Sequence, residues 1–126
     1  PLMLFKVFRT PTFEKEFSKL PKAEKVAIEK FEKKLVENPY IGKPLGYVFF
    51  REKKLNGTRV YYLVYEGFVM VLMVAVSDKK TQQATIDAIK ERLELLCLCQ
   101  RNAKKTLSNS LESTVFKVFQ ATHQLI

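Results

Sequence analysis

The chain has 126 residues, 47% of them apolar, and its 22 lysines and arginines outnumber its 13 aspartates and glutamates, which gives a net charge of +9. This size and apolar content fit one domain with a single core and argue against a chain that is disordered throughout. The charge is typical of a protein that binds a nucleic acid, an anionic membrane surface or an acidic protein, although a basic protein with many surface lysines has the same total.

The first third of the chain predicts a strand and then a helical hairpin. The run Leu2–Phe8 is strand-like, and Thr10 follows it as a helix cap. A first helix then extends to Pro21, which suits the first turn of a second helix, and that helix ends at Asn38 before a proline. The apolar residues that recur at helical spacing on the two helices are Phe13, Phe17, Leu20, Ala27, Ile28, Phe31 and Leu35.

After a predicted loop at residues 40–46, three strand-like runs follow, at Tyr47–Leu55, Thr58–Tyr65 and Phe68–Val76. Asn56-Gly57 is a strong signal for a two-residue hairpin turn between the first two runs. A third helix follows Ser77-Asp78 and carries an apolar stripe of Ile86, Ile89, Leu93 and Leu96. The sequence therefore predicts an α+β fold, in the order strand, two helices, a three-stranded antiparallel meander and a helix.

Residues 1–98 are predicted to form one domain, and residues 99–126 a C-terminal extension that is a peripheral helix or partly disordered. The extension differs in composition, because residues 100–114 are rich in Ser, Asn and Lys. We expect its apolar residues to cover part of the sheet or helix surface.

Several classes of function are not expected. The longest apolar run, Phe68–Val76, has nine residues and is too short to cross a bilayer as a helix. Lys6 and Arg9 interrupt the N-terminal run, which therefore lacks the layout of a signal peptide. Cys97 and Cys99 would point about 200° apart on a helix, so they form a poor zinc site. We expect a cytoplasmic protein with reduced thiols, no membrane partner and no cofactor.

The hairpin separates its side chains into two faces. With a two-residue turn, Lys54 lies opposite Arg59 and Glu52 opposite Tyr61. One face then carries Phe50, Glu52, Lys54, Arg59, Tyr61, Leu63 and Tyr65. The other face carries Phe49, Arg51, Lys53, Val60, Tyr62 and Val64, and its larger apolar patch is expected to face the helices.

The first of these faces has the composition of an RNA site, because Arg and Lys neutralise phosphate while the rings of Tyr61 and Tyr65 can stack on bases. An exposed sheet face with ordinary Lys, Glu and Tyr pairs fits these residues equally well. Lys79 and Lys80 favour binding, since they follow the central strand where its end can approach Arg59. The cations crowded at the hairpin tip repel one another, and an anionic partner, RNA or an acidic protein, would relieve this.

Five segments, FEKEFSKLP, ENPYIGKPL, GTRVYYLVYE, VLMVAVSDKK and AIKERL, occur in this order. Together they resemble the RelE/ParE superfamily of toxin–antitoxin toxins over about residues 2–96. The resemblance implies a small antiparallel sheet with an N-terminal helical hairpin and a C-terminal helix. RelE-like members are ribosome-dependent endoribonucleases that cut mRNA, whereas ParE-like members inhibit DNA gyrase. Both are neutralised by an antitoxin.

The resemblance assigns roles to single positions. Arg59, in the G-x-R-x-x-Y segment, matches the arginine that contacts the scissile phosphate, and Lys79, with Lys80 as the alternative register, matches a basic residue that acts on the leaving group. Glu52 matches a glutamate that serves as general base in some members. Some members carry two basic residues on the strand before the turn, at the positions of Phe50 and Glu52 in this sequence. If the alignment is shifted by one residue, these basic positions match Arg51 and Lys53. The aromatic residue of the last family helix falls at Thr85 and is therefore missing.

The function expected from this resemblance is a metal-independent cleavage of mRNA. Glu52 would be the base, Arg59 the phosphate clamp, and Lys79 or Lys54 would stabilise the developing charge. Arg51, Lys53, Lys80, Tyr61 and Tyr65 would contact the RNA. Lysine, with a reference pKa of about 10.4, is a weak acid catalyst near neutral pH, so a slow reaction or one oriented by the ribosome is expected. The alternatives are a gyrase inhibitor and an inactive module that binds RNA or an antitoxin.

Overall fold

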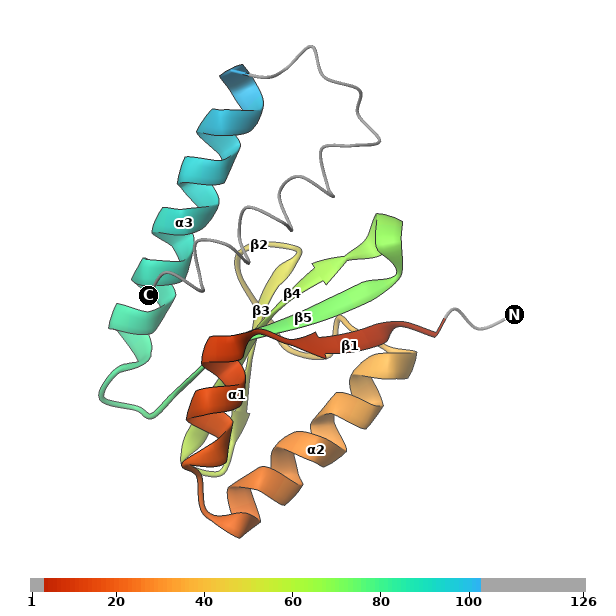
Figure 1. Cartoon of the computed structure of the whole chain (residues 1–126), viewed down its shortest axis with the longest axis vertical. Helices are drawn as coiled ribbons and strands as arrows, with labels where there is room; N and C mark the ends of the chain where they lie inside the picture. Colours follow the sequence, from red (N-terminus) through yellow and green to blue (C-terminus); the bar gives the residue numbers. More distant parts are fainter. Residues whose placement is uncertain (1–3, 103–126) are drawn as a thin grey trace.

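The structure, a computed structural model, describes residues 4–102, and their side chains up to residue 94. Figure 1 shows one mixed sheet with helices on both of its faces. The elements in chain order are β1 (Lys6–Arg9), α1 (Pro11–Ser18), α2 (Lys22–Glu37), β2 (Lys43–Tyr47), β3 (Phe50–Leu55), β4 (Thr58–Tyr65), the 3₁₀ turn η1 (Glu66–Phe68), β5 (Met70–Ser77) and α3 (Gln82–Asn102). The predicted α+β fold, with its helical hairpin, meander and final helix, is confirmed.

Capping residues and prolines mark the ends of the two helices of the hairpin. Thr10 Oγ1 accepts a hydrogen bond from the Phe13 N–H at 3.2 Å, and Pro11 occupies the first helical position, where its missing N–H costs nothing. Pro21 is the residue just before α2, and Asn38 with its extended backbone ends this helix. The first strand covers Lys6–Arg9 rather than the predicted Leu2–Phe8, of which residues 2 and 3 lie outside the described part.

The sheet has five strands in the order β1-β5-β4-β3-β2, and β1 is parallel to β5 while the other neighbours are antiparallel. The β3–β4 register, with Lys54 opposite Arg59 and Glu52 opposite Tyr61, is the predicted one. The prediction of a loop at residues 40–46 was wrong from residue 43 on, because β2 begins there. The predicted run Tyr47–Leu55 is correspondingly divided, since Tyr47 ends β2 and β3 begins only at Phe50. Pro44 and Gly46, whose φ is +91°, are unusual in strands, so this short edge strand has no recognisable strand pattern.

Each face of the sheet packs on different helices. One core lies between α1, α2 and the face that bears Val60, Tyr62 and Val64, as predicted. The other core lies between α3 and the opposite face, where Ile86, Ile89 and Leu93 of the predicted stripe cover Phe50, Tyr61, Leu63 and Tyr65. The expectation that Tyr61 and Tyr65 offer their rings to bases was wrong, because α3 leaves their side chains 0% and 8% exposed.

An extra residue in β5 decides which side chains face α3. Tyr61 pairs with Ala75 but Tyr62 pairs with Met73, so Val74 has no partner of its own in the register. Such a β-bulge reverses the alternation of side chains beyond it. Ser77 therefore lies on the same face as Tyr61, and their oxygens are 2.8 Å apart.

The last helix continues beyond the predicted domain boundary at residue 98 and reaches Asn102, the last residue that the structure describes. Residues 103–126, most of the predicted extension, lie outside the described residues, so the division into 1–98 and 99–126 stays a prediction. Within residues 4–102, no helix is both long and apolar enough to cross a membrane.

Candidate nucleic-acid interface

Arg59 lies at the centre of the charged end of the sheet. On β4 it is opposite Lys54 of β3 on one side and Ser77 of β5 on the other. Its side chain is only 8% exposed, whereas Lys54 is exposed. The register of the three strands therefore places Arg59 between a lysine and a serine.

Glu52 is the carboxylate of this region and is itself 8% exposed. It is opposite Tyr61 on β4 and Lys43 on β2. Gln82, the first residue of α3, donates a hydrogen bond from Nε2 to Glu52 Oε2 at 2.8 Å. A neutral amide thus binds a largely buried carboxylate.

Three cations surround Glu52 without neutralising it. Directly opposite residues have Cβ atoms about 4.5–5.5 Å apart and diagonal ones about 7–8 Å, which places Lys43, opposite Glu52, and Arg59, at its diagonal, within reach of the carboxylate. Lys54 lies two residues further along β3, on the same face as Glu52. The ion pairs between described side chains are nevertheless those of Arg9 with Glu14 and Glu32. Within residues 4–94, Glu52 and Arg59 form none, so the positive charge of this end of the sheet stays available to an anionic ligand.

The turn between β5 and α3 brings Lys79 and Lys80 to the same end of the sheet, two and three residues beyond Ser77, and both are exposed. Asp78 fixes this turn, because its Oδ1 accepts hydrogen bonds from the Thr81 N–H at 2.9 Å and the Thr81 hydroxyl at 3.0 Å. These bonds lower the pKa of Asp78, the backbone bond most. The two lysines are thus carried by a defined turn.

Tyr61 belongs to the buried part of the site. Burial is the largest cause that raises its pKa, to about 12. The hydrogen bond with Ser77 and the charge of Arg59 act in the opposite direction, while the Glu52 carboxylate adds to the increase. Tyr61 therefore stays protonated and uncharged at neutral pH, and it forms the buried floor beside Glu52.

Arg51 and Lys53 lie on the opposite face and are not brought together with Arg59. Arg51 donates hydrogen bonds from Nε to the Gly42 carbonyl at 2.9 Å and from Nη1 to the Val48 carbonyl at 2.7 Å. Its guanidinium carbon also lies 5.3 Å from the centroid of the Tyr40 ring. Arg51 thus holds the segment around β2, and Lys53, opposite Val60, is half-buried. The structure thus places Arg51 and Lys53 on the face of the sheet that packs on α1 and α2, away from Arg59.

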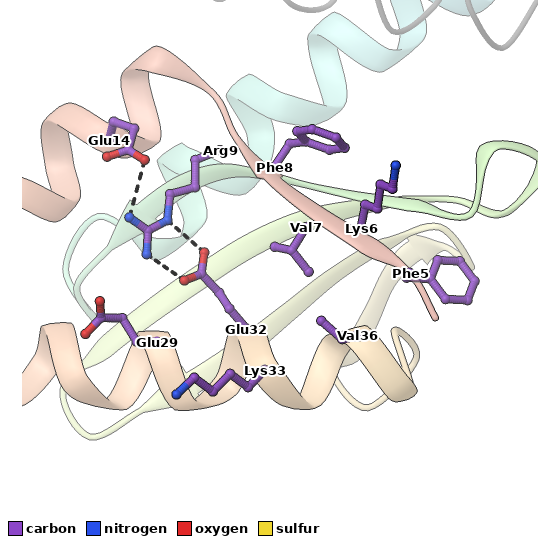
Figure 2. A pocket seen from close by; sticks show the side chains of 10 residues that line it. All are labelled: Phe5, Lys6, Val7, Phe8, Arg9, Glu14, Glu29, Glu32, Lys33 and Val36. Carbon is purple, nitrogen blue, oxygen red and sulfur yellow. Dashed lines mark hydrogen bonds and ion pairs between the residues drawn. The ribbon is translucent and has the colours of Figure 1, made fainter. Parts of the chain in front are cut away.

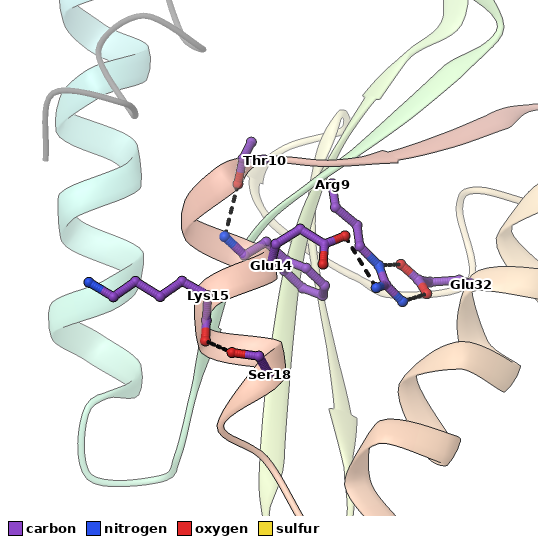
Figure 3. Close-up of polar contacts among 7 residues, drawn as sticks. Arg9, Thr10, Glu14, Lys15, Ser18 and Glu32 are labelled. Carbon is purple, nitrogen blue, oxygen red and sulfur yellow. Dashed lines mark hydrogen bonds and ion pairs between the residues drawn. The ribbon is translucent and has the colours of Figure 1, made fainter. Parts of the chain in front are cut away.

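A concave region lies between β1 and α2, where a cavity of about 760 Å³ is lined by Phe5, Val7, Val36, Glu29 and Lys33 among others (Figure 2). Its half-buried cation, Arg9, is already paired. Arg9 donates to both oxygens of Glu32, at 2.8 and 2.6 Å, and to Glu14 at 3.3 Å (Figure 3). Its guanidinium carbon lies 4.1 Å from the centroid of the Phe17 ring. The hydrogen bond to Glu32 is the largest cause that raises the pKa of Arg9. This region connects β1, α1 and α2 and is poorly suited to an anion.

Known structures share this architecture. No family model and no curated protein matches the chain. Among solved structures, a double-arginine mutant of the free E. coli toxin RelE has 22% sequence identity and a TM-score of 0.61, over 70% of this chain and 97% of that chain. RelE in the intact E. coli RelBE toxin–antitoxin complex has 24% sequence identity and a TM-score of 0.55, over 59% of this chain and 95% of that chain. The archaeal RelE–RelB complex of Pyrococcus horikoshii has 19% sequence identity and a TM-score of 0.54, over 60% of this chain and 96% of that chain.

This chain has the RelE fold. The resemblance read from the sequence is therefore confirmed at the level of the fold. The shared region excludes about a third of this chain, and the free toxin is matched over almost its whole length. Thr85, at the position expected for an aromatic residue, lies in the first turn of α3 and is half-buried.

In this RelE fold, sequence reasoning missed three residues at the site. Lys43 was assigned to a loop because β2 has no strand pattern. The bulge at Val74 determines where Ser77 points, and a uniformly apolar strand gives no sign of a bulge. Gln82 stands in a stretch of polar residues, and only the path of the β5–α3 turn directs it to Glu52.

Proposed function

We propose that this protein is the toxin of a toxin–antitoxin pair and acts as a RelE-like, ribosome-dependent endoribonuclease that inhibits translation by cutting mRNA. One observation carries this proposal: Glu52 and Arg59 lie diagonally across neighbouring strands, both largely buried, and neither forms an ion pair within residues 4–94. A carboxylate and a guanidinium group held so close without pairing can each act on a different atom of a phosphodiester.

Binding of the substrate would rest on the cations. Arg59 would donate two parallel hydrogen bonds to the oxygens of the scissile phosphate, which suits the planar guanidinium group. Lys54, opposite Arg59, would contact the same or the next phosphate. Lys79 and Lys80 would approach from the β5–α3 turn. Because α3 covers Tyr61 and Tyr65, bases would stack outside this core.

Cleavage requires two proton transfers, one from the attacking ribose 2′-OH and one to the 5′ oxygen that leaves. Glu52 accepts the proton of the ribose 2′-OH, and the 2′ oxygen forms a bond to phosphorus. The bond from phosphorus to the 5′ oxygen breaks, and this oxygen takes a proton, delivered by Lys79, by Lys80 or by water. The products are a 2′,3′-cyclic phosphate and a 5′-hydroxyl, and no metal is needed. Arg59 and Lys54 stabilise the extra negative charge on the phosphoryl oxygens at the transition state.

The ribosome would compensate for the lack of an efficient acid catalyst in this chain by orienting the RNA. The sequence has one histidine, His123, outside the described residues, and lysine is a weak acid catalyst near neutral pH. Holding the 2′-OH in line with the phosphorus atom can by itself supply a large part of the rate enhancement. We therefore place the reaction on mRNA held in a ribosome, in the cytoplasm.

A cognate antitoxin is the second partner of this proposal. The structures similar to this chain include RelE bound to RelB and to an antitoxin peptide. The net charge of +9 and the crowded cations of the hairpin tip favour an antitoxin with an acidic segment. Binding there would also relieve the repulsion between Lys54 and Arg59.

Controlled expression in bacteria tests the proposal. We expect growth arrest with the natural chain and normal growth with Arg59→Ala at equal protein level and unchanged thermal midpoint. Lys30→Ala, which removes an exposed lysine of α2, serves as the matched control and should arrest growth fully. A folded Arg59→Ala variant that is still fully toxic would remove the nuclease proposal.

A second candidate is a ParE-like inhibitor of DNA gyrase, favoured by threonine at position 85, where the nuclease branch has an aromatic residue. Separate pulse-labelling of DNA and protein distinguishes the two activities. Loss of protein synthesis first supports the nuclease, and loss of DNA synthesis with translation intact supports the gyrase inhibitor. If neither label falls, the chain is an inactive module that binds RNA or an antitoxin.

A further inference from the structure

Glu52 binds an unexpected partner. A carboxylate that is 8% exposed and has Lys43 and Tyr61 on either side and Arg59 at the diagonal would ordinarily take a cation. Its Oε2 instead accepts the Nε2–H of Gln82 at 2.8 Å. The amide occupies one of about four acceptor positions of the carboxylate. The Tyr61 hydroxyl group also interacts with Glu52, and this interaction raises the pKa of Tyr61.

The backbone position of Gln82 is fixed independently of this bond. The hydrogen bonds of Asp78 with Thr81 shape the turn before it, and the Thr85 N–H binds the Thr81 carbonyl at 3.0 Å to start the helix. Ile86, one turn later, is buried against the sheet. The amide is therefore delivered to Glu52 from a rigid element, which reduces the entropy lost when the bond forms.

We propose that Gln82 is a positioning residue that holds the Glu52 carboxylate towards α3 and keeps it out of an ion pair with Lys43, Lys54 or Arg59. This inference rests on the proposed nuclease function and deepens it. If Glu52 paired with Arg59, the base would be turned from the ribose and the clamp would be neutralised before RNA arrived. The neutral amide prevents both losses because it adds no charge that would compete with Arg59 for phosphate.

The neighbouring residue provides a matched control. Gln83 has the same side chain in the same turn of α3, but its Nε2 donates to Asp87 Oδ1 at 2.9 Å on the exposed side of the helix. Leucine at either position removes the amide and keeps a similar volume. Only the change at position 82 alters the surroundings of Glu52.

Cleavage of mRNA in a purified translation system tests the activity. Gln82→Leu should lower kcat on the order of 10- to 100-fold with little change in KM, because the bond orients a reacting group and does not bind RNA. Gln83→Leu should leave both constants unchanged. In the Glu52→Gln background, Gln82→Leu should cause no further loss, since Gln82 acts through Glu52. An unchanged kcat for Gln82→Leu, or an equal loss in the Glu52→Gln background, overturns the inference.

NMR tests the same contact without any activity. The side-chain amide protons of Gln82 should exchange slowly in the full chain and quickly in Glu52→Ala, and the Arg59 Hε signal should become protected in Gln82→Leu as an ion pair with Glu52 forms. Gln82→Ala serves if the leucine variant does not fold. Absence of both changes overturns the inference even if the natural chain cuts mRNA. Both changes in a chain that cuts no RNA support the positioning contact and overturn the proposed nuclease.

Discussion

Lys54 on β3 lies directly opposite Arg59 on β4, so neighbouring strands hold two cations next to each other, beside the turn that joins them. Like charges in such positions oppose folding by a few tenths to about 1 kcal/mol. The arrangement is a cost to the free protein that a bound phosphate would remove.

Lys54→Gln should therefore stabilise the protein and weaken its binding to RNA. We expect the free energy of unfolding to rise by up to about 1 kcal/mol, measured by urea denaturation at low salt. In the same variant, the slope of the logarithm of RNA affinity against the logarithm of salt should fall by about 0.7, the value for one phosphate contact on a single strand. Lys53→Gln is the control, because Lys53 is opposite the apolar Val60. Equal stabilisation by both changes would contradict this explanation.

Gly42 packs too closely for any side chain. A Cβ atom there would lie 2.6 Å from Tyr62 Oη and 2.8 Å from the Glu52 carbonyl oxygen, and the Gly42 N–H donates to Tyr62 Oη at 2.9 Å. Gly42→Ala should lower the free energy of unfolding by about 1–3 kcal/mol, the usual range for overpacking. Gly57→Ala is the matched control and should have little effect, because a Cβ at Gly57 would meet nothing within 4 Å. Chemical denaturation of both variants checks this, and equal losses would count against the close packing.

Alkaline pH should unfold the protein through its buried tyrosines. The folded state raises the pKa of Tyr61 from 10.0 to about 12, mainly by burial, and raises those of Tyr40 and Tyr62 as well. A raised pKa contributes stability that is complete below the unfolded value and is lost as the pH rises through the folded value. Stability should thus fall between about pH 10 and pH 12, and Tyr61→Phe should make the decline shallower. Denaturation curves across this range test it, and an identical decline in Tyr61→Phe would exclude Tyr61 as a cause.

Arg9 should be the main polar connection between β1 and α2. Arg9→Met leaves the Glu32 carboxylate, 13% exposed, without its cation, and we expect a loss of about 2 kcal/mol or more. The double variant Arg9→Met/Glu32→Met should recover most of this loss, because no charge is then left buried. Glu14→Gln, at an exposed pair, should cost less than about 1 kcal/mol. A double variant as unstable as Arg9→Met would show that packing, not charge, dominates here.

The sequence was sufficient for the parts of the fold that local chemistry determines. Asn56-Gly57 set the β3–β4 register, and the register correctly placed Lys54 opposite Arg59. Thr10 and Pro21 correctly marked the helix starts. These signals act within a few residues, so one sequence contains them.

The site was less predictable, because its geometry depends on contacts between distant segments. The alternation of side chains along β3 and β4 correctly put Glu52 and Arg59 on one face, but nothing in these strands shows that α3 covers Tyr61. The direction of α3, which also brings Gln82 to Glu52, is set by the turn at Asp78 and by core packing. Residues separated by thirty positions in the chain thus meet for reasons that no local pattern records.

The most direct test of the nuclease proposal maps the 5′ ends of mRNA in a purified translation system supplied with the natural chain, Arg59→Lys or Arg59→Ala. The proposal predicts discrete cuts within translated codons, a partial loss with lysine, and a loss on the order of 100- to 1,000-fold with alanine in a protein that is still folded. Equal cutting by Arg59→Ala, or no cutting by the natural chain on translating ribosomes, would contradict it.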